Sequence, residues 1–104
     1  MDNKIDIRFL SQDITKSNYD WANLYNGNEM VGKSRCKKKN NEIIIYSIMI
    51  FPEYQGNDYG KIFINQLKFE YDKIIADRVR NKAIGFWKKM GFIKDGTSQY
   101  SWKK

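Results

Sequence analysis

Residues 43–60, IIIYSIMIFPEYQGNDYG, contain the pattern that decides the fold. Residues 43–50 are mostly apolar and rich in β-branched isoleucine, which predicts a strand buried on both faces. Pro52 ends this strand, because proline has no N–H group to donate to a sheet. The polar residues and glycines of 55–60 then predict a turn.

A helix is predicted after this turn, over Lys61–Tyr71, because apolar residues recur there at helical spacing. The apolar stripe consists of Ile64, Leu67 and Tyr71, widened by Ile62, Phe63 and Phe69. A strand, a glycine turn and a helix in this order direct several backbone N–H groups and a helix N-terminus toward one point. We therefore expect a phosphate-bearing ligand over Gln55–Lys61.

The rest of the chain predicts a mostly antiparallel sheet with one further helix. The expected strands are 5–9, Trp21–Tyr25, Glu29–Lys37, Lys73–Val79, Phe92–Lys94 and Gln99–Trp102, and the expected helix is Asn81–Met90 with Gly91 as its C-terminal cap. Asn26-Gly27-Asn28 predicts a hairpin, and Lys37–Asn41 a polar turn. Ser11–Asp20 is expected to be irregular apart from a short helical turn. The one parallel pair should join the central strand to the strand around Ile74.

Composition narrows the class of protein. A chain of 104 residues with 41% hydrophobic residues is expected to form one domain, 1–104. It has no apolar run of bilayer length and no signal-peptide layout, so we expect no membrane partner. The single cysteine, Cys36, excludes an internal disulfide and favours the cytoplasm, and the absence of histidine argues against a metal site. The net charge of +7 reflects either plain solubility or anionic partners.

Two segments resemble the acyl-CoA binding motifs of the GNAT superfamily of N-acetyltransferases. In the first, Ile50, Pro52 and Tyr54 precede the glycine turn QGNDYG; the second is AIGFWKKMGF, residues 83–92. The resemblance implies an α+β, GNAT-like fold with a mixed, mostly antiparallel sheet and helices packed on it. The N-terminal half is shortened, because Ser11–Asp20 replaces the family's long helices between the first two strands. That loss leaves the acceptor side open.

The resemblance also implies acetyl-CoA as co-substrate, with a defined set of binding residues. The pantetheine arm would lie along the backbone of Ile48, Met49 and Ile50, entering through a splay between this strand and the strand at Ile74. The pyrophosphate would meet the backbone amides of Gln55, Gly56, Asn57, Asp58, Tyr59, Gly60 and Lys61. Asn81 and Trp87, on the later helix, complete the expected set.

Two positions depart from the family pattern, and no catalytic residue is assigned. Asp58 stands where the family usually has glycine, although aspartate tolerates the left-handed conformation that the turn needs. Trp87 replaces the tyrosine that protonates the leaving thiolate in many members, and an indole cannot give up a proton at neutral pH. We expect Trp87 to be a core residue. Cys36 is also expected to be structural, and residues 43–51 contain no acid.

Two functions remain open at this stage. The first is transfer of an acyl group, expected to be acetyl, from acyl-CoA to an amine by direct attack. The amine would be presented by a large, locally acidic partner or by a protein bound to nucleic acid. The second is a non-catalytic module that binds an acidic protein or nucleic acid through its basic surface. That surface consists of Lys33, Arg35, Lys37, Lys38 and Lys39. It carries no nucleic-acid-binding motif.

Overall fold

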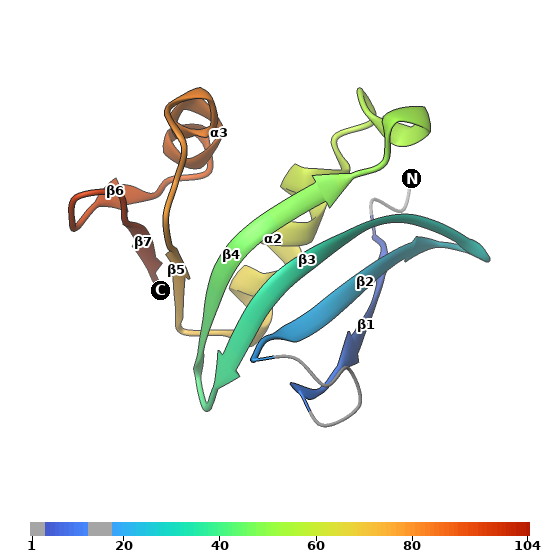
Figure 1. The fold of residues 1–104 in the computed structure, drawn as a ribbon, viewed down its shortest axis with the longest axis horizontal. Coiled ribbons are helices and arrows are strands. Elements are labelled where there is room, and N and C mark those ends of the chain that lie inside the picture. The colour runs from blue at the N-terminus through green and yellow to red at the C-terminus, as the bar shows by residue number, and fades with distance from the viewer. Residues whose placement is uncertain (1–3, 13–17) are drawn as a thin grey trace.

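The computed structural model describes residues 4–12 and 18–104, which form a seven-stranded sheet with helices (Figure 1). The strands are β1 (Asp6–Leu10), β2 (Asp20–Asn26), β3 (Glu29–Lys39), β4 (Glu42–Ile50), β5 (Lys73–Ala76), β6 (Ile93–Lys94) and β7 (Tyr100–Lys103). Their order across the sheet is β1-β2-β3-β4-β5-β7-β6. The helices are α2 (Tyr59–Glu70) and α3 (Ile84–Lys89), preceded by the 3₁₀ turns η1 (Pro52–Tyr54) and η2 (Asn81–Ala83).

The strand directions follow the prediction. All neighbouring strands are antiparallel except β4 and β5, which α2 connects as a crossover helix. The hairpin at Gly27, the stop at Pro52 and the positive φ of Gly91 after α3 are confirmed as well. The mixed α+β architecture is therefore the one that the sequence predicted.

The core lies on one face of the sheet only. Phe63, Ile64 and Leu67 of α2 are fully buried in one cluster with Ile43 and Ile74. The opposite face turns toward the viewer in Figure 1, where no described helix covers β2–β4. Ile44 is only partly buried and Met49 is 53% exposed, so the prediction that residues 43–50 are buried on both faces is wrong. The prediction failed because an apolar run does not reveal which faces of a strand receive a partner.

The burial of two single residues also differs from what the sequence pattern predicts. Phe69, predicted to widen the apolar stripe, is 87% exposed because it lies on the outer side of α2. Strict alternation along the predicted strand Glu29–Lys37 would put Val31 on the same face as Lys33. Val31 is instead fully buried, because Leu24 pairs with Gly32 and Tyr25 with Met30, which makes Val31 the extra residue of a bulge. No helix of the described residues has the length and apolarity needed to cross a membrane.

Element ends also shifted. The turn predicted over Lys37–Asn41 is shorter, since β3 continues to Lys39 and Asn40 takes a positive φ of 46°. The strand predicted over Lys73–Val79 ends at Ala76, and the predicted helix over Asn81–Met90 begins as a 3₁₀ turn. The sequence predicts a short helical turn after Thr15 or Ser17; residues 13–17 lie outside the described residues, and residues 18–19 form a bend that leads into β2.

Candidate active site

A cleft opens where β4 and β5 part. Their pairing ends at Ile45 and Ala76, after which the Asp77 N–H donates a 2.9 Å hydrogen bond to the Ile45 carbonyl. Arg78 then turns the chain away from β4 with a φ of 55°, a conformation that side chains other than glycine seldom adopt. The resulting cleft has a volume of about 810 Å³. This is the splay that the family resemblance implied beside Met49.

One edge of β4 faces this cleft. The Phe51 N–H donates to the Val31 carbonyl of β3 at 2.9 Å, so the neighbouring Ile50 carbonyl points the opposite way, into the cleft. Gln55 Nε2 donates to that carbonyl at 2.9 Å. Because the backbone groups of alternate residues point to the same side of a strand, the N–H and C=O of Ile48 also face the cleft. An extended ligand can therefore hydrogen-bond to β4 there as an added strand does.

The turn after β4 exposes backbone donors at the start of α2. Gly56 and Asp58 have φ values of 88° and 62°, and Asp58 is the N-cap residue. Ile62 N–H donates to the Asp58 carbonyl at 2.9 Å, so the amides of residues 59–61 precede the first bond of the helical ladder. The expectation that aspartate tolerates the left-handed conformation is confirmed. Its exposed carboxylate borders a separate depression of about 550 Å³, together with Lys4 and Lys61.

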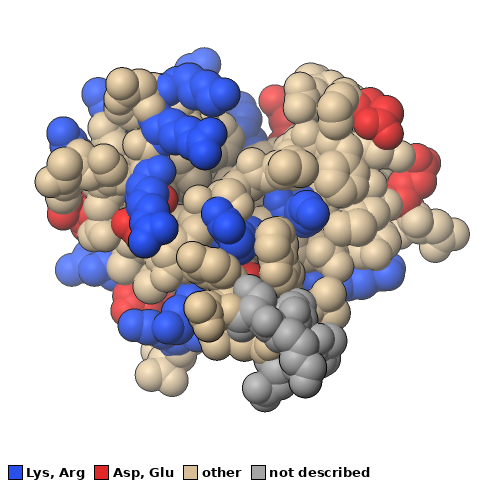
Figure 2. Space-filling model, in the orientation of Figure 1, with Lys and Arg blue, Asp and Glu red and all other residues tan. Residues whose placement is uncertain are grey.

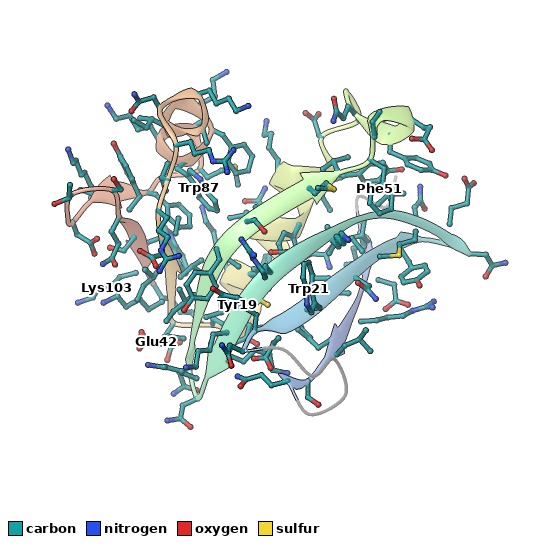
Figure 3. All side chains as sticks on the ribbon, in the orientation of Figure 1. Tyr19, Trp21, Glu42, Phe51, Trp87 and Lys103 are labelled. Carbon is teal, nitrogen blue, oxygen red and sulfur yellow. The ribbon has the colours of Figure 1, made fainter. Side chains whose placement is uncertain are left out.

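Trp87 lies beneath the cleft as a core residue. Its side chain is 6% exposed, and its ring centroid is 5.1 Å from that of Phe86 and 4.8 Å from that of Phe92 (Figure 3). A Cβ atom on Gly60 would lie 3.5 Å from the Phe86 ring, so the start of α2 and α3 meet closely here. The structure thus bears out the core role expected for Trp87.

The predicted binding residues divide into three groups. Those that line the cleft are Ile48, Met49, Ile50, Gln55, Gly60 and Trp87. Asn57, Asp58 and Lys61 border the smaller depression on the other side of the turn. Gly56, Tyr59 and Asn81 line neither, although Arg80 and Lys82, on either side of Asn81, line the cleft.

The end of the cleft away from the turn contains residues that the sequence did not single out. Arg35 pairs with Ser47 and Cys36 with Ile45, so Tyr46 is the extra residue of a bulge in β4. Its ring meets the Tyr19 ring edge-on, with centroids 4.9 Å apart, and Figure 3 shows Tyr19 close to β3 and β4. Tyr46, Tyr19 and Arg35 all line the cleft.

Asp77 supplies the only carboxylate among the described residues that line the cleft. Burial, followed by the negative charge of Asp77, raises the pKa of the Tyr46 hydroxyl above its usual value, and both residues line the cleft. The sequence interpretation missed Asp77 because it placed this residue inside a strand. The available signal was the apolar run Ile74–Ala76, which an acid follows directly.

Cys36 takes no part in this site. It is fully buried on the core side of β3, and burial, reinforced by the charge of Asp20, raises the pKa of its thiol to about 12. A thiol in this state is a poor nucleophile, because the thiolate is the reactive form. The structural role expected for Cys36 is consistent with this environment.

Comparison with known proteins gives a family match and several relatives. The family model described as an acetyltransferase (GNAT) domain matches residues 18–94. An uncharacterised N-acetyltransferase from Oceanobacillus iheyensis is 35% identical over 52 residues, which cover 50% of this chain and 32% of that protein. This chain therefore matches only about a third of that relative's length.

Solved structures show the same fold at low sequence identity. An acetyltransferase from Thermus thermophilus superposes with a TM-score of 0.67 at 20% identity, covering 89% of this chain and 71% of that one. The YlbP N-acetyltransferase of Bacillus subtilis, solved with coenzyme A, gives 0.64 at 20% identity, covering 90% and 74%. Because the family model covers most of the chain, including β2–β6 and both helices, this protein belongs to the GNAT family of acetyltransferases.

Proposed function

We propose that this protein is an acetyl-CoA-dependent N-acetyltransferase that transfers the acetyl group to an amine by direct attack. The observation that carries the proposal is the cleft between β4 and β5, with the free backbone edge of Ile48 on its wall and the amides of residues 59–61 near its mouth. The first suits the amide-bearing pantetheine arm, and the second suits a pyrophosphate. Structural relatives solved with coenzyme A support the same assignment.

The residues at the far end of the cleft supply the chemistry. Asp77 accepts a proton from the acceptor amine, directly or through one water, so that the nitrogen lone pair can attack the thioester carbonyl carbon. The new C–N bond forms a tetrahedral intermediate, whose nitrogen gives its remaining extra proton to water. Collapse of this intermediate breaks the C–S bond and releases the thiolate of CoA. Solvent protonates that thiolate, because the buried indole of Trp87 has no proton to give. Holding both reactants in the cleft supplies several kcal/mol through proximity, roughly 7–11 kcal/mol at best.

Acetyl-CoA titration followed by ¹H–¹⁵N NMR tests the binding mode. We expect the amide signals of Ile48 and of residues 59–61 to shift in parallel with the heat measured by calorimetry. The amides of β1, on the far edge of the sheet, serve as an internal control and should stay in place. Absence of binding would exclude the proposed acetyltransferase. So would shifts confined to the basic residues on the uncovered face of β2–β4, such as Lys33.

A second candidate, a module that binds an anionic macromolecule, is favoured by the uncovered face of the sheet. There Arg8 lies 3.8 Å from the centroid of the Tyr25 ring, and Lys33 lies 5.1 Å from that of Trp21. Figure 2, in the same orientation as Figure 1, shows some blue Lys and Arg side chains at the centre of the view and more at the left, on the side of α3 and β5–β7. Fluorescence anisotropy with labelled poly-glutamate and with a single-stranded DNA oligonucleotide distinguishes an acidic protein from a nucleic acid as the partner. Tight, salt-sensitive binding without any acetyl-CoA binding would favour this candidate.

A further inference from the structure

Arg35 brings a positive charge to the inner end of the cleft. Its guanidinium carbon lies 4.9 Å from the centroid of the Tyr19 ring, and the side chain lines the cleft. Within residues 4–12 and 18–104, its Nε atom is buried without any hydrogen-bond partner. The ion pairs of the described residues are Arg8–Asp6 and Arg78–Asp77, so no described carboxylate pairs with Arg35.

Among the described residues, this arrangement leaves a buried donor without a partner. Buried polar atoms in proteins nearly always have a partner, and exceptions concentrate at functional sites. A guanidinium is charged at every physiological pH and presents its donors in a planar fork that fits a carboxylate or a phosphate. The missing partner of Arg35 is therefore best supplied by an anionic group that enters the cleft.

Arg35 lies near the proposed reaction centre at Asp77. Arg35 of β3 pairs with Ser47 of β4, and Asp77 follows the last residue of β5 that pairs with β4. These residues form a row across three neighbouring strands, so Arg35 and Asp77 stand about two strand spacings, roughly 10 Å, apart. The pantetheine arm of acetyl-CoA would start near the backbone amides of residues 59–61, run along Ile50 and Ile48, and end at this row. The thioester would thus lie between a cation and a carboxylate.

We propose that the acceptor is a small amine with its own anionic group, such as an α-amino acid, whose carboxylate or phosphate binds Arg35 while its amine points to Asp77. This inference rests on the acetyl transfer proposed above and names its substrate class. Asp77 is available for this role, because its contact with Arg78 is long, 3.8 Å from Oδ2 to Nε, and the Arg78 side chain is 79% exposed. Tyr46 lies on β4, between the strands of Arg35 and Asp77, and its ring meets the Tyr19 ring edge-on, so the two rings give the acceptor an apolar support.

The first experiment reads Arg35 directly and needs no turnover. The arginine Nε–H signals of Arg8, Arg35, Arg78 and Arg80 are recorded by ¹H–¹⁵N NMR, and Arg35→Gln assigns the Arg35 signal by its disappearance. The protein, saturated with CoA, is titrated with N-acetylglycine, inorganic phosphate and neutral N-acetylglycinamide. We expect the Arg35 signal to shift with at least one of the two anions and to stay in place with the amide. An Arg35 signal that ignores both anions overturns the inference.

The second experiment compares matched acceptors in the presence of acetyl-CoA. Glycine is paired with glycinamide, and phosphoethanolamine with ethanolamine, so that each pair differs in one anionic group. We expect the anionic member of at least one pair to have a kcat/KM about tenfold higher or more, and the better pair distinguishes carboxylate from phosphate. Arg35→Gln should raise KM for that acceptor about tenfold while leaving KM for acetyl-CoA unchanged.

Lys33→Gln is the matched control, because it removes one positive charge from the same strand and the same face, where Lys33 lies over Trp21 instead of in the cleft. An equal effect of Lys33→Gln and Arg35→Gln would indicate general attraction and overturn the inference. Equal rates for both members of each pair would do the same while leaving the acetyltransferase proposal intact. Failure of acetyl-CoA to bind removes both proposals and is detected separately in the calorimetric titration.

Discussion

The side-chain amide of Gln55 donates a 2.9 Å hydrogen bond to the carbonyl oxygen of Ile50, so a residue of the turn closes the end of the free β4 edge. The adjacent edge groups, at Ile48, lie deeper in the cleft. An extended ligand would therefore pair with Ile48, while its phosphates turn the corner at Gln55 toward the start of α2. The backbone N–H groups at the start of α2 would then contact the phosphates, and substitutions there test this contact.

Gly60→Pro should abolish acetyl-CoA binding while the protein still folds. Gly60 is the second residue of α2, where an N–H has no partner within the helix and where proline is tolerated. The substitution removes one of the donors expected to hold the pyrophosphate. Calorimetry measures the affinity, and circular dichroism checks the fold.

Gly60→Ala is the control for this substitution. It keeps the N–H, and its Cβ would lie in ordinary contact with the Phe86 ring at 3.5 Å. We expect its affinity for acetyl-CoA to remain within a few-fold of the original. A folded Gly60→Pro variant with the same affinity as Gly60→Ala would remove these amides from the binding site.

Trp87→Phe should reduce stability and leave most of the acetyl transfer intact. The indole is 6% exposed and packs against Phe86 and Phe92, so the smaller ring loses burial worth roughly 1–2 kcal/mol. Thermal denaturation should show a lower Tm, by roughly 4–8 °C for each kcal/mol. A hundred-fold fall in kcat at an unchanged Tm would instead show that the indole takes part in the chemistry.

The buried thiol of Cys36 should make the protein less stable at alkaline pH. Its pKa is about 12 in the folded protein against a usual 9.0, so only the unfolded chain ionises between these values. The stabilisation is complete below pH 9 and is lost as the pH rises toward 12, by about 1.4 kcal/mol for each pH unit within that window.

Cys36→Ala isolates this contribution in urea denaturation at several pH values. Lysines and tyrosines titrate in both proteins, so the difference between the two free energies of unfolding reports the thiol alone. We expect the advantage of the original protein to shrink above pH 9. A difference that is independent of pH would mean that the thiol ionises equally in the folded and the unfolded chain.

Polycationic amines should be poor acceptors. The cleft is lined by Arg35, Arg78, Arg80 and Lys82 against the single carboxylate of Asp77 among the described residues, so spermidine and kanamycin meet net repulsion. Raising the ionic strength from about 0.01 M to about 0.1 M shortens the screening length from about 30 Å to about 10 Å. Their kcat/KM should be low and should rise with salt, whereas that of an anionic acceptor should fall. Fast acetylation of spermidine that ignores salt contradicts this prediction.

The strand–turn–helix unit was predictable because its determinants are local. Isoleucine favours the strand, Pro52 ends it, and the glycines and Asp58 accept positive φ values where the chain turns into α2. The hairpin at Gly27 follows from the same local chemistry. These elements place the expected phosphate site without any knowledge of the tertiary structure.

The acceptor end of the cleft was not predictable, because it depends on how distant strands pair. Asp77 enters the site only because β5 ends one residue earlier, and Tyr46 is re-aimed by a bulge that appears only in the pairing of β3 with β4. In the sequence, Arg35 was one of five basic residues assigned together to a surface for an acidic protein or nucleic acid. Its buried Nε distinguishes it from its neighbours, and burial is a property of the folded chain.

The uncovered face of the sheet has a consequence for how this protein can evolve. Packing residues such as Leu24 and Phe63 lie on the α2 side, whereas Arg35 and Ser47 lie on the other side, where β-strand alternation keeps their side chains out of the core. Selection can therefore change a front-face residue with little loss of folding free energy, since most such losses come from core positions. Residues on one face of the sheet thus determine stability, and residues on the other face would contact the acceptor. Substitutions at positions such as Ser47 can therefore change the preferred acceptor with little loss of stability.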